Sequence, residues 1–429
     1  MYEKFSSIRL DLFKLHDSKD TTKNWLFAKG KTLKIELKGL ISKTSFSNTE
    51  LVKYLMKKLN ISIASAERLV YLKKEWYPLS FIEELVNLTS SDKYQIQDKI
   101  EFLKSCKPPV VEYKAVKELT IDLCKIAGAH AADGTLYDSY IAITDNHKSN
   151  ILALMKWFEG FGYSPKLMRI GENEYGIKFH SRILSRYLTK FFDFPSGCKQ
   201  YTVKESEIIR NAPLEFRKAF ALGALTFDGC VTSGNKIELC VSSKGFRDSI
   251  AEILTELGVN HVSMEKQSSD YWRLWSKSLS KEEVLKWIEL FEPNTEKWFK
   301  LNDYVNGFSC KVSSFEEAVY ILNSVYPKQS GSKVVLKDVL LAFNELKQTY
   351  RYELADYLAK KKNLKSYGGT WAHSLRHHLD ILKRANIISV EKQRFHPKKS
   401  FGTTVREVYR FNENVEGWRV PERSIILNT

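Results

Sequence analysis

The chain is poor in cysteine: it has six among 429 residues, and no two of them form a Cys-x-x-Cys pair. This scarcity argues against a structural zinc site and against a disulfide framework. Long apolar runs are absent too, and none approaches the roughly 20 residues of a membrane-spanning helix. The segment Met1–Lys4 lacks the layout of a signal peptide. We therefore expect an intracellular protein in a reducing compartment, with no membrane association.

Acidic residues are in short supply relative to basic ones: 51 Asp and Glu against 67 Lys and Arg give a net charge of +16. The excess is unevenly placed. Residues 331–410 hold 17 Lys and Arg against 7 Asp and Glu, whereas residues 121–300 hold 24 against 23. Basic charge concentrated in one C-terminal segment favours a polyanionic partner, and we expect double-stranded DNA.

One nine-residue pattern occurs twice, each time as an apolar helical run that stops at Asp-Gly. The copies are Ile126–Gly134 and Ala221–Gly229. Glycine just past a helix end is typical of a left-handed cap. The positions of Asp133 and Asp228 are unfavourable, because their carboxylates lie at the negative ends of the helix dipoles. Two occurrences suggest that a bound cation supplies positive charge there; the alternative is a plain turn after a core helix.

Glycine and alanine thin the walls of both helices, so the two can cross backbone to backbone. Such a crossing would place Asp133 and Asp228 side by side, where two carboxylates repel unless one is protonated or a divalent ion bridges them. Hard oxygen ligands suit Mg²⁺ or Mn²⁺. A metal held in this way can activate water against a phosphodiester.

The similarity between the two copies continues beyond the motif. The two aspartates are 95 residues apart, and each is followed by a strand, a helix, a second strand segment and a closing helix. We expect these elements at 140–144, 151–162, 177–182 and 183–191 in the first copy, and at 237–241, 250–258, 272–277 and 284–291 in the second. The pattern predicts an α+β fold built from two αββαββα units in tandem.

Residues 117 to about 300 resemble a single-chain LAGLIDADG homing endonuclease, whose defining helix ends in Asp-Gly. The resemblance implies a duplicated core with pseudo-twofold symmetry, in which two saddle-shaped antiparallel sheets cover the major groove of DNA. It also implies that Asp133 and Asp228 are catalytic and bind the metal. The main-chain carbonyls of Ala132 and Phe227 would face the same ion.

The family often places a basic residue near the active site, in the strand before the last helix of each half. By alignment this role falls on Lys178 and Arg273, with Lys277 as a substitute for Arg273 and a further DNA contact. Two positions depart from the family pattern. His130 is expected to be a core histidine, and the bulky Phe227 is expected to hold the motif helices apart.

The C-terminal segment has the pattern of a winged helix-turn-helix. We expect helices at 334–346, 352–361 and 371–385, followed by a β-hairpin wing from 387 to 410. In such modules the third helix enters the major groove and the wing contacts the backbone. The expected DNA contacts are Lys365, Arg376, His377, Lys383, Lys392, Arg394, Lys398 and Lys399.

The N-terminal segment is predicted to be a mixed, largely helical module. Lys31–Ser42 alternates like a strand, whereas Ser47 and Glu50 form a capping signal for a helix to Lys58. A second helix is predicted at 63–73, and the pair is either a helix-turn-helix or a plain packing module. We expect domains at 1–108, 117–210, 211–305 and 331–415.

Together these features predict a site-specific, Mg²⁺-dependent (or Mn²⁺-dependent) double-strand DNA endonuclease that acts as a monomer with internal pseudo-twofold symmetry. Two alternatives stay open at this point. One is a regulator that binds DNA on the same scaffold without cleaving it, and the other is an intron-splicing maturase.

Overall fold

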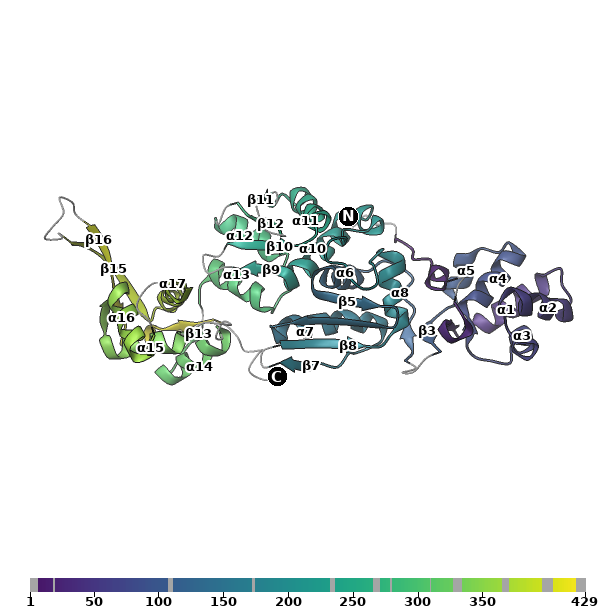
Figure 1. Ribbon diagram of the computed structural model, residues 1–429, viewed down its shortest axis with the longest axis horizontal. Coiled ribbons are helices and arrows are strands. Elements are labelled where there is room, and N and C mark those ends of the chain that lie inside the picture. Colours follow the sequence, from purple (N-terminus) through teal and green to yellow (C-terminus); the bar gives the residue numbers. More distant parts are fainter. Residues whose placement is uncertain are drawn as a thin grey trace. The chain divides into compact units, whose positions relative to one another are not determined.

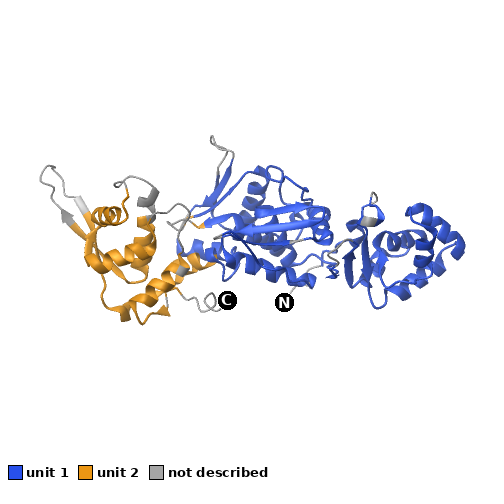
Figure 2. Ribbon diagram, turned by 60° about the horizontal axis from the view of Figure 1, so that its bottom comes forward, with its two compact units in different colours: residues 1–230, 237–297 blue, residues 231–236, 298–429 orange. Residues whose placement is uncertain are grey.

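The protein is described by a computed structural model over residues 7–17, 20–106, 111–171, 174–231, 236–264, 271–277, 280–308, 310–326, 334–364, 370–395 and 404–421. It divides into two compact units (Figure 2). Unit 1 comprises residues 1–230 and 237–297, and unit 2 comprises residues 231–236 and 298–429. Antiparallel sheets occur in both units alongside helices, so the predicted α+β class is confirmed (Figure 1).

The N-terminal part of unit 1 combines helices with a sheet of strand order β2-β1-β3-β4, whose strands pair antiparallel. The elements are η1 (Leu12–Leu15), η2 (Thr22–Asn24), β1 (Leu26–Lys29), α1 (Leu33–Lys43), α2 (Asn48–Lys58), α3 (Ile63–Val70), β2 (Tyr77–Pro78), α4 (Leu79–Thr89), α5 (Lys93–Asp98), β3 (Phe102–Ser105) and β4 (Tyr113–Lys114).

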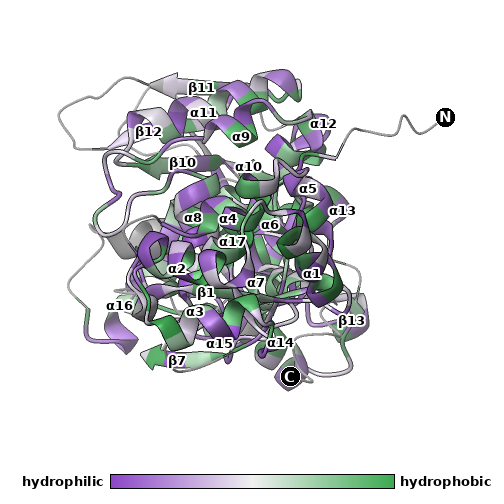
Figure 3. Cartoon of the chain, turned by 90° about the vertical axis from the view of Figure 1, so that its right-hand side faces the viewer, coloured by the Kyte–Doolittle hydropathy of each residue, from purple (hydrophilic) through white to green (hydrophobic). Residues whose placement is uncertain are grey.

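The prediction of a strand over Lys31–Ser42 is wrong, because α1 occupies this segment. The buried residues of α1 are Leu33, Leu37 and Leu40, whose spacings of four and three residues are helical. Ile35, which suggested the alternation, is 70% exposed. Figure 3 shows the resulting mixture of hydrophobic and hydrophilic residues along α1.

The rest of unit 1 runs twice through the order helix, two strands, helix, two strands, helix. The first run is α6 (Ile121–Asp133), β5 (Gly134–Tyr137), β6 (Tyr140–Asp145), α7 (Lys148–Phe158) with η3 (Glu159–Phe161), β7 (Met168–Gly171), β8 (Glu174–Phe179) and α8 (Arg182–Phe191). After α9 (Glu207–Arg210), the second run is α10 (Leu214–Asp228), β9 (Gly229–Val231), β10 (Ile237–Val241), α11 (Lys244–Glu256), β11 (His261–Met264), β12 (Trp272–Ser276) and α12 (Lys281–Ile288).

The two sheets have equivalent strand orders, β5-β6-β8-β7 and β9-β10-β12-β11. Burial alternates along β5, β6, β9 and β10, as expected for strands with one covered face. Ile141, Ile177 and Leu274 are buried in strands that contact the helices of their own half. The opposite face of each sheet carries the more exposed side chains, among them Lys178 and Arg273.

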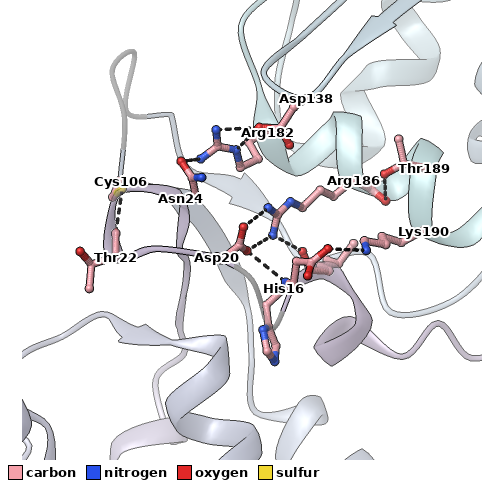
Figure 4. Close-up of polar contacts among 12 residues, drawn as sticks. His16, Asp20, Thr22, Asn24, Cys106, Asp138, Arg182, Arg186, Thr189 and Lys190 are labelled. Atoms are coloured by element: carbon pink, nitrogen blue, oxygen red, sulfur yellow. Dashed lines mark hydrogen bonds and ion pairs between the residues drawn. The ribbon is translucent and has the colours of Figure 1, made fainter. Parts of the chain in front are cut away.

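Helix α8 is tied to the N-terminal segment by a row of basic side chains (Figure 4). The guanidinium of Arg186 bonds both carboxylate oxygens of Asp20 and the main-chain oxygen of Leu15, and both charged side chains are buried. Removing one member of such a pair would leave the other charge buried and uncompensated. The pair therefore fixes the N-terminal segment on the first half.

Unit 2 consists of helices and two small sheets. α13 (Glu296–Asn306) begins in unit 1 and leads to β13 (Cys310–Lys311), α14 (Phe315–Val325), α15 (Leu336–Leu346), β14 (Gln348–Tyr350), α16 (Arg351–Lys361), α17 (Thr370–Arg384), β15 (Ile388–Phe395), β16 (Thr404–Phe411), η4 (Val415–Gly417) and β17 (Arg419–Val420). Strands β14, β16 and β15 form one sheet, and β15 and β16 pair from Ile388↔Phe411 to Phe395↔Thr404. Within the described ranges, no helix has both the length and the apolar character needed to cross a bilayer.

Candidate functional site

The site is built on the crossing of α6 and α10. A Cβ atom on Gly128 would lie 2.0 Å from the carbonyl oxygen of Phe220, and one on Gly223 would lie 2.1 Å from that of Lys125. Side-chain atoms do not come this close to main-chain atoms, so only glycine allows the crossing. The close contact that the small residues predict is therefore present.

Phe227 does not hold the helices apart, so that expectation is wrong. Its side chain is buried and its ring packs edge-on against Trp157 of α7, with 6.4 Å between ring centroids. The bulk is accommodated by α7, and the crossing at Gly128 stays tight.

The glycines after the two aspartates do not adopt the left-handed conformation expected of them. Gly134 and Gly229 have φ of −81° and −63°, because the chain passes directly from helix into strands β5 and β9. A Cβ on Gly229 would lie 2.3 Å from the carbonyl oxygen of Leu225. These glycines are required by close packing at the helix-to-strand junction and not by a positive φ.

Asp133 and Asp228 lie together at the ends of α6 and α10, and their carboxyl groups hydrogen-bond each other. Burial, and then the charge of Asp133, raise the pKa of Asp228 to about 7. Burial and the charge of Asp145 also raise the pKa of Asp133. Near neutral pH the pair therefore shares a proton, as expected for two adjacent carboxylates.

The C-terminal end of α6 is capped by a lysine from outside the motif. The ammonium of Lys199 donates to the main-chain oxygens of His130, Ala131 at 2.7 Å and Ala132 at 2.9 Å. Burial lowers the pKa of Lys199 to about 8, although the charge of Asp228 acts in the opposite direction.

The end of α10 is capped in the same way by Lys297, at the start of α13. Its ammonium donates to the main-chain oxygens of Thr226, at 2.7 Å, and Phe227. Lysine side chains are favoured here because the free carbonyls of a helix end carry negative partial charge. The prediction that a bound cation supplies this positive charge is therefore not needed at the helix ends, because Lys199 and Lys297 supply it.

Each aspartate lines its own cavity. The first cavity, of about 330 Å³, brings Asp133 together with Phe227 and Lys297. The second, of about 380 Å³, brings Asp228 together with Ala132 and Lys199. Each cavity thus combines the acid of one helix with the end of the other helix and the lysine that caps it.

The remaining linings of the two cavities differ. The first cavity is also lined by Thr144, Asp145, Asn146, His147 and Glu174. The second is also lined by Ala131, Gly134, Thr135, Gly197, Cys198, Gln200, Val203, Cys240, Val241, Ser242, Ser243, Phe246 and Tyr271.

The donor set at the acid pair suits a hard divalent cation. Two carboxylates and the main-chain oxygens of Ala132 and Phe227 are oxygen ligands of the kind that Mg²⁺ prefers, and Mg²⁺ commonly keeps water or phosphate oxygens in its remaining positions. In the described part of the chain, no three His, Cys, Asp or Glu side chains group around a common metal position. An ion here would therefore depend on two carboxylates, and it would compete with Lys199 and Lys297 for the carbonyl oxygens.

His130 is a core residue, as expected. It is fully buried, its ring lies 5.2 Å from that of Phe194, and neither ring nitrogen has a hydrogen-bond partner among the described residues. Burial and the charge of Lys199 hold its pKa well below the usual range. His130 is therefore neutral and packs as an apolar ring.

The basic residues predicted beside the acids lie elsewhere on the two sheets. Lys178 is exposed on β8 with its ammonium 5.0 Å from the ring centroid of Tyr140, and Arg273 is exposed on β12 opposite Cys240. Lys277 is exposed just after β12. None of the three lines either cavity.

The predicted C-terminal contacts are only partly described. Arg376 and Lys383 are exposed on α17, Lys392 is exposed on β15, and His377 is half-buried with its ring 6.1 Å from that of Tyr326. Lys365, Lys398 and Lys399, together with the side chain of Arg394, fall outside the described residues.

Sequence reasoning missed the two capping lysines. Lys199 follows Asp133 by 66 residues and Lys297 follows Asp228 by 69, each beyond the last helix of its half. Their separation of 98 residues is close to the 95 between the aspartates, and extending the repeat past 291 could have paired them.

No family model and no curated protein matches the chain. Among solved structures, mesophilic variants of the homing endonuclease I-DmoI are similar over 41% of this chain and 95% of theirs, with 16% identity and a TM-score of 0.32. I-DmoI in complex with DNA and Mn matches over 36% of this chain and 88% of its own, with 16% identity and a TM-score of 0.28. Full-length DUF199/WhiA from Thermatoga maritima matches over 63% of this chain and 94% of its own, with 13% identity and a TM-score of 0.31.

Proposed function

We propose that the chain is a site-specific DNA endonuclease of the LAGLIDADG homing type, which hydrolyses both strands of duplex DNA with Mg²⁺ or Mn²⁺. The observation that supports this best is the pair of equivalent cavities that meet at one acid pair. Cutting both strands requires two phosphodiester bonds to be hydrolysed, and two adjacent cavities that each hold an aspartate, the end of the opposite motif helix and its capping lysine meet that need.

The free-energy cost of burying the charged groups around Asp133 and Asp228 supports a catalytic role for this site over simple DNA binding. Lys297 is buried, and the pKa of Asp228 is raised to about 7. Removing charged groups from water costs several kcal/mol per ion, and perturbed pKa values of this kind cluster at functional sites. A scaffold that only binds DNA through its sheets would need no such centre.

In this proposal Asp133 and Asp228 hold the metal, aided by the carbonyls of Ala132 and Phe227. A bound divalent ion supplies an activated water and neutralises the leaving oxygen. Lys199 and Lys297 line the cavities and can turn from the helix carbonyls toward a phosphate oxygen, where their charge would stabilise the transition state.

The exposed basic residues then serve to hold DNA. We propose that Lys178, Arg273 and Lys277 contact phosphates of the DNA backbone where it lies along the two sheets. We further propose that residues 331–415 form a winged helix-turn-helix, in which Arg376 on α17 and Lys392 on β15 contact DNA. The other domains of this proposal are 1–108, 117–210 and 211–305. A tethered second binding module raises affinity through effective concentration without contacting the cut site.

The decisive experiment selects cleaved molecules from a library of supercoiled plasmids with randomised inserts, in the presence of Mg²⁺. We expect a defined site to be cut, and Asp133→Asn and Asp228→Asn each to slow cleavage by about a thousandfold or more, equivalent to about 4 kcal/mol of transition-state stabilisation. Both variants should bind the selected site as tightly as the unmodified chain.

A second candidate is a regulator that binds DNA and does not cleave it. The capping lysines favour it, because two ammonium groups and one shared proton can balance the acid pair without any metal. Tight binding to a selected site with no cleavage in Mg²⁺ or Mn²⁺ would support this regulator and rule out the endonuclease.

A further inference from the structure

Helices α2 and α3 in the N-terminal part form a well-defined pair that the acid centre does not use. Ser47 caps α2 in a capping box with Glu50, and Ser62 caps α3 through the N–H of Ser65. The connection is short, with Asn60 in the left-handed conformation at φ 50°. Both helices therefore begin at defined residues, and the turn between them is tight.

One face of this pair is buried and the other is open. The buried residues are Leu51, Val52, Leu55, Ala66, Leu69 and Val70. Large apolar side chains remain on the open side of α3: Ile63 at its start is 54% exposed, and Tyr71 just past its end is 52% exposed. Both side chains are therefore accessible to a partner that binds along α3.

The charge of the N-terminal part is concentrated on these two helices. Residues 43–74 hold seven Lys and Arg against two Asp and Glu, a net charge of +5. The flanking residues 26–42 and 75–105 together hold seven of each, a net charge of zero. The net positive charge of residues 26–105 therefore lies on the segment that contains α2 and α3.

Most of this charge is available to a partner. Glu50, one of the two acids, accepts bonds from the N–H and hydroxyl of Ser47. Lys57, Arg68 and Lys74 are exposed, and among the described residues none of them forms an ion pair. A basic cluster in which seven Lys and Arg face only two acids is complementary to a polyanion.

We propose that α2 and α3 are a second DNA-binding element, with α3 in the major groove of duplex DNA and Lys57, Arg68 and Lys74 on the phosphates. A tight pair of helices with an open second helix is the arrangement by which a helix-turn-helix reads duplex DNA. Ile63, at the N-terminal end of α3, would reach base edges, where apolar groups contact thymine methyls. The proposal rests on the proposed function only in that both require DNA.

The first test measures binding to a pool of random-sequence duplex DNA in EDTA, so that cleavage plays no part. The triple variant Lys57→Ala, Arg68→Ala, Lys74→Ala should bind more weakly, and its salt dependence should fall by up to about 2.7 in the slope of log K against log salt, at about 0.9 per phosphate contact. A matched control removes three lysines at α1: Lys31→Ala, Lys34→Ala, Lys38→Ala.

The control should retain the slope of the unmodified chain. An equal loss in both variants would mean that net charge alone is responsible, and no loss in the α2–α3 variant would mean that this surface does not contact DNA; either result overturns the proposal. All six positions are exposed, so equal thermal unfolding of the variants is expected and shows that folding is not the cause.

The second test identifies the partner class directly. A photo-crosslinking phenylalanine analogue replaces Tyr71, which is nearly isosteric, and the protein is irradiated with duplex DNA, with RNA hairpins of random loop sequence, or alone. Crosslinks to duplex DNA support the proposal, and crosslinks only to RNA or to a second copy of the chain overturn it. Crosslinking to duplex DNA by a chain that cleaves no DNA would reject the endonuclease and support the α2–α3 surface. Cleavage without crosslinking would support the endonuclease and reject this surface.

Discussion

The cavity at Asp133 is lined by two further carboxylates and a histidine, whereas the cavity at Asp228 is lined by no other acid and by two cysteines, Cys198 and Cys240. What the two share is the acid, the end of the opposite motif helix and its capping lysine. The shared parts all depend on the crossing of α6 and α10. The parts that differ come from the strands and loops around it.

This comparison separates two kinds of constraint. The centre is held by main-chain contacts at Gly128 and Gly223, which tolerate no added atom. The surrounding side chains have no such restriction, so the two halves could diverge in charge and reactivity. Under the proposed function, each cavity hydrolyses one DNA strand. The two strands are therefore expected to be cut in sites that differ in the charged and reactive side chains around the aspartate.

The largest expected effect comes from filling the crossing. Gly128→Ala or Gly223→Ala would place a Cβ about 2 Å from a main-chain oxygen, and such overpacking costs about 1–3 kcal/mol or more. Gly39 in the exposed part of α1 has open space around its Cβ position, so Gly39→Ala should instead stabilise by up to about 1 kcal/mol. Urea unfolding of the three variants measures this, and a stabilised Gly128→Ala would refute the tight crossing.

The crossing and the acid pair were also the parts that the sequence predicted best. Small residues and a terminal Asp-Gly act locally, so a pattern of nine residues was enough to place Asp133 beside Asp228. Periodicity predicted the helix after Ser47 and the β15–β16 hairpin for the same reason.

The failures have a common physical origin in tertiary contacts. Lys199 and Lys297 reach the site from positions more than 60 residues away, and no local pattern marks a lysine as a helix cap. Leu33, Ile35 and Leu37 alternate as in a strand, and only the packing of α1 distinguishes the buried Leu33, Leu37 and Leu40 from the exposed Ile35. The capacity of α7 to accommodate Phe227 depends on Trp157, which no spacing rule links to it.

A second effect of comparable size concerns the shared proton. The pKa of Asp228 is about 7 in the folded protein, above its ordinary 3.8, so the folded state holds a proton that the unfolded state has lost between these values. The stability contributed by this proton is greatest below 3.8 and is lost as pH rises through 7. The unfolding free energy of Asp228→Asn, relative to the unmodified chain, should therefore rise over this range by on the order of 4 kcal/mol, at about 1.4 kcal/mol per pKa unit. A difference that stays constant with pH would show that the pair does not share a proton.

The capping lysines allow the two helix ends to be compared directly. Lys297→Met would leave the buried carbonyl of Phe227 without its donor, at a cost of about 1–3 kcal/mol. Lys199 is less buried, so water can replace part of its bonding and Lys199→Met should cost less. Lys218, half-buried on α10 and paired with the exposed Glu289, is the matched control, and Lys218→Met should change stability by less than about 1 kcal/mol. Urea unfolding measures these losses of stability, and equal losses for Lys199→Met and Lys297→Met would argue against a difference between the ends of α6 and α10.

The smallest effect tests the difference between the cavities themselves. Alkylation with a small maleimide should modify Cys198 and Cys240, which are exposed and line the second cavity. On a supercoiled substrate the strand served by that cavity should then be cut about tenfold more slowly, equivalent to about 1.4 kcal/mol, so that nicked circles accumulate. The double variant Cys198→Ser, Cys240→Ser should resist this treatment, whereas Cys230→Ser should not, because Cys230 is exposed on β9 but does not line the cavity. If each cavity cuts one strand, modification of the second cavity slows the cutting of one strand and leaves nicked circles. Equal slowing of both strands would therefore show that the two cavities do not act separately.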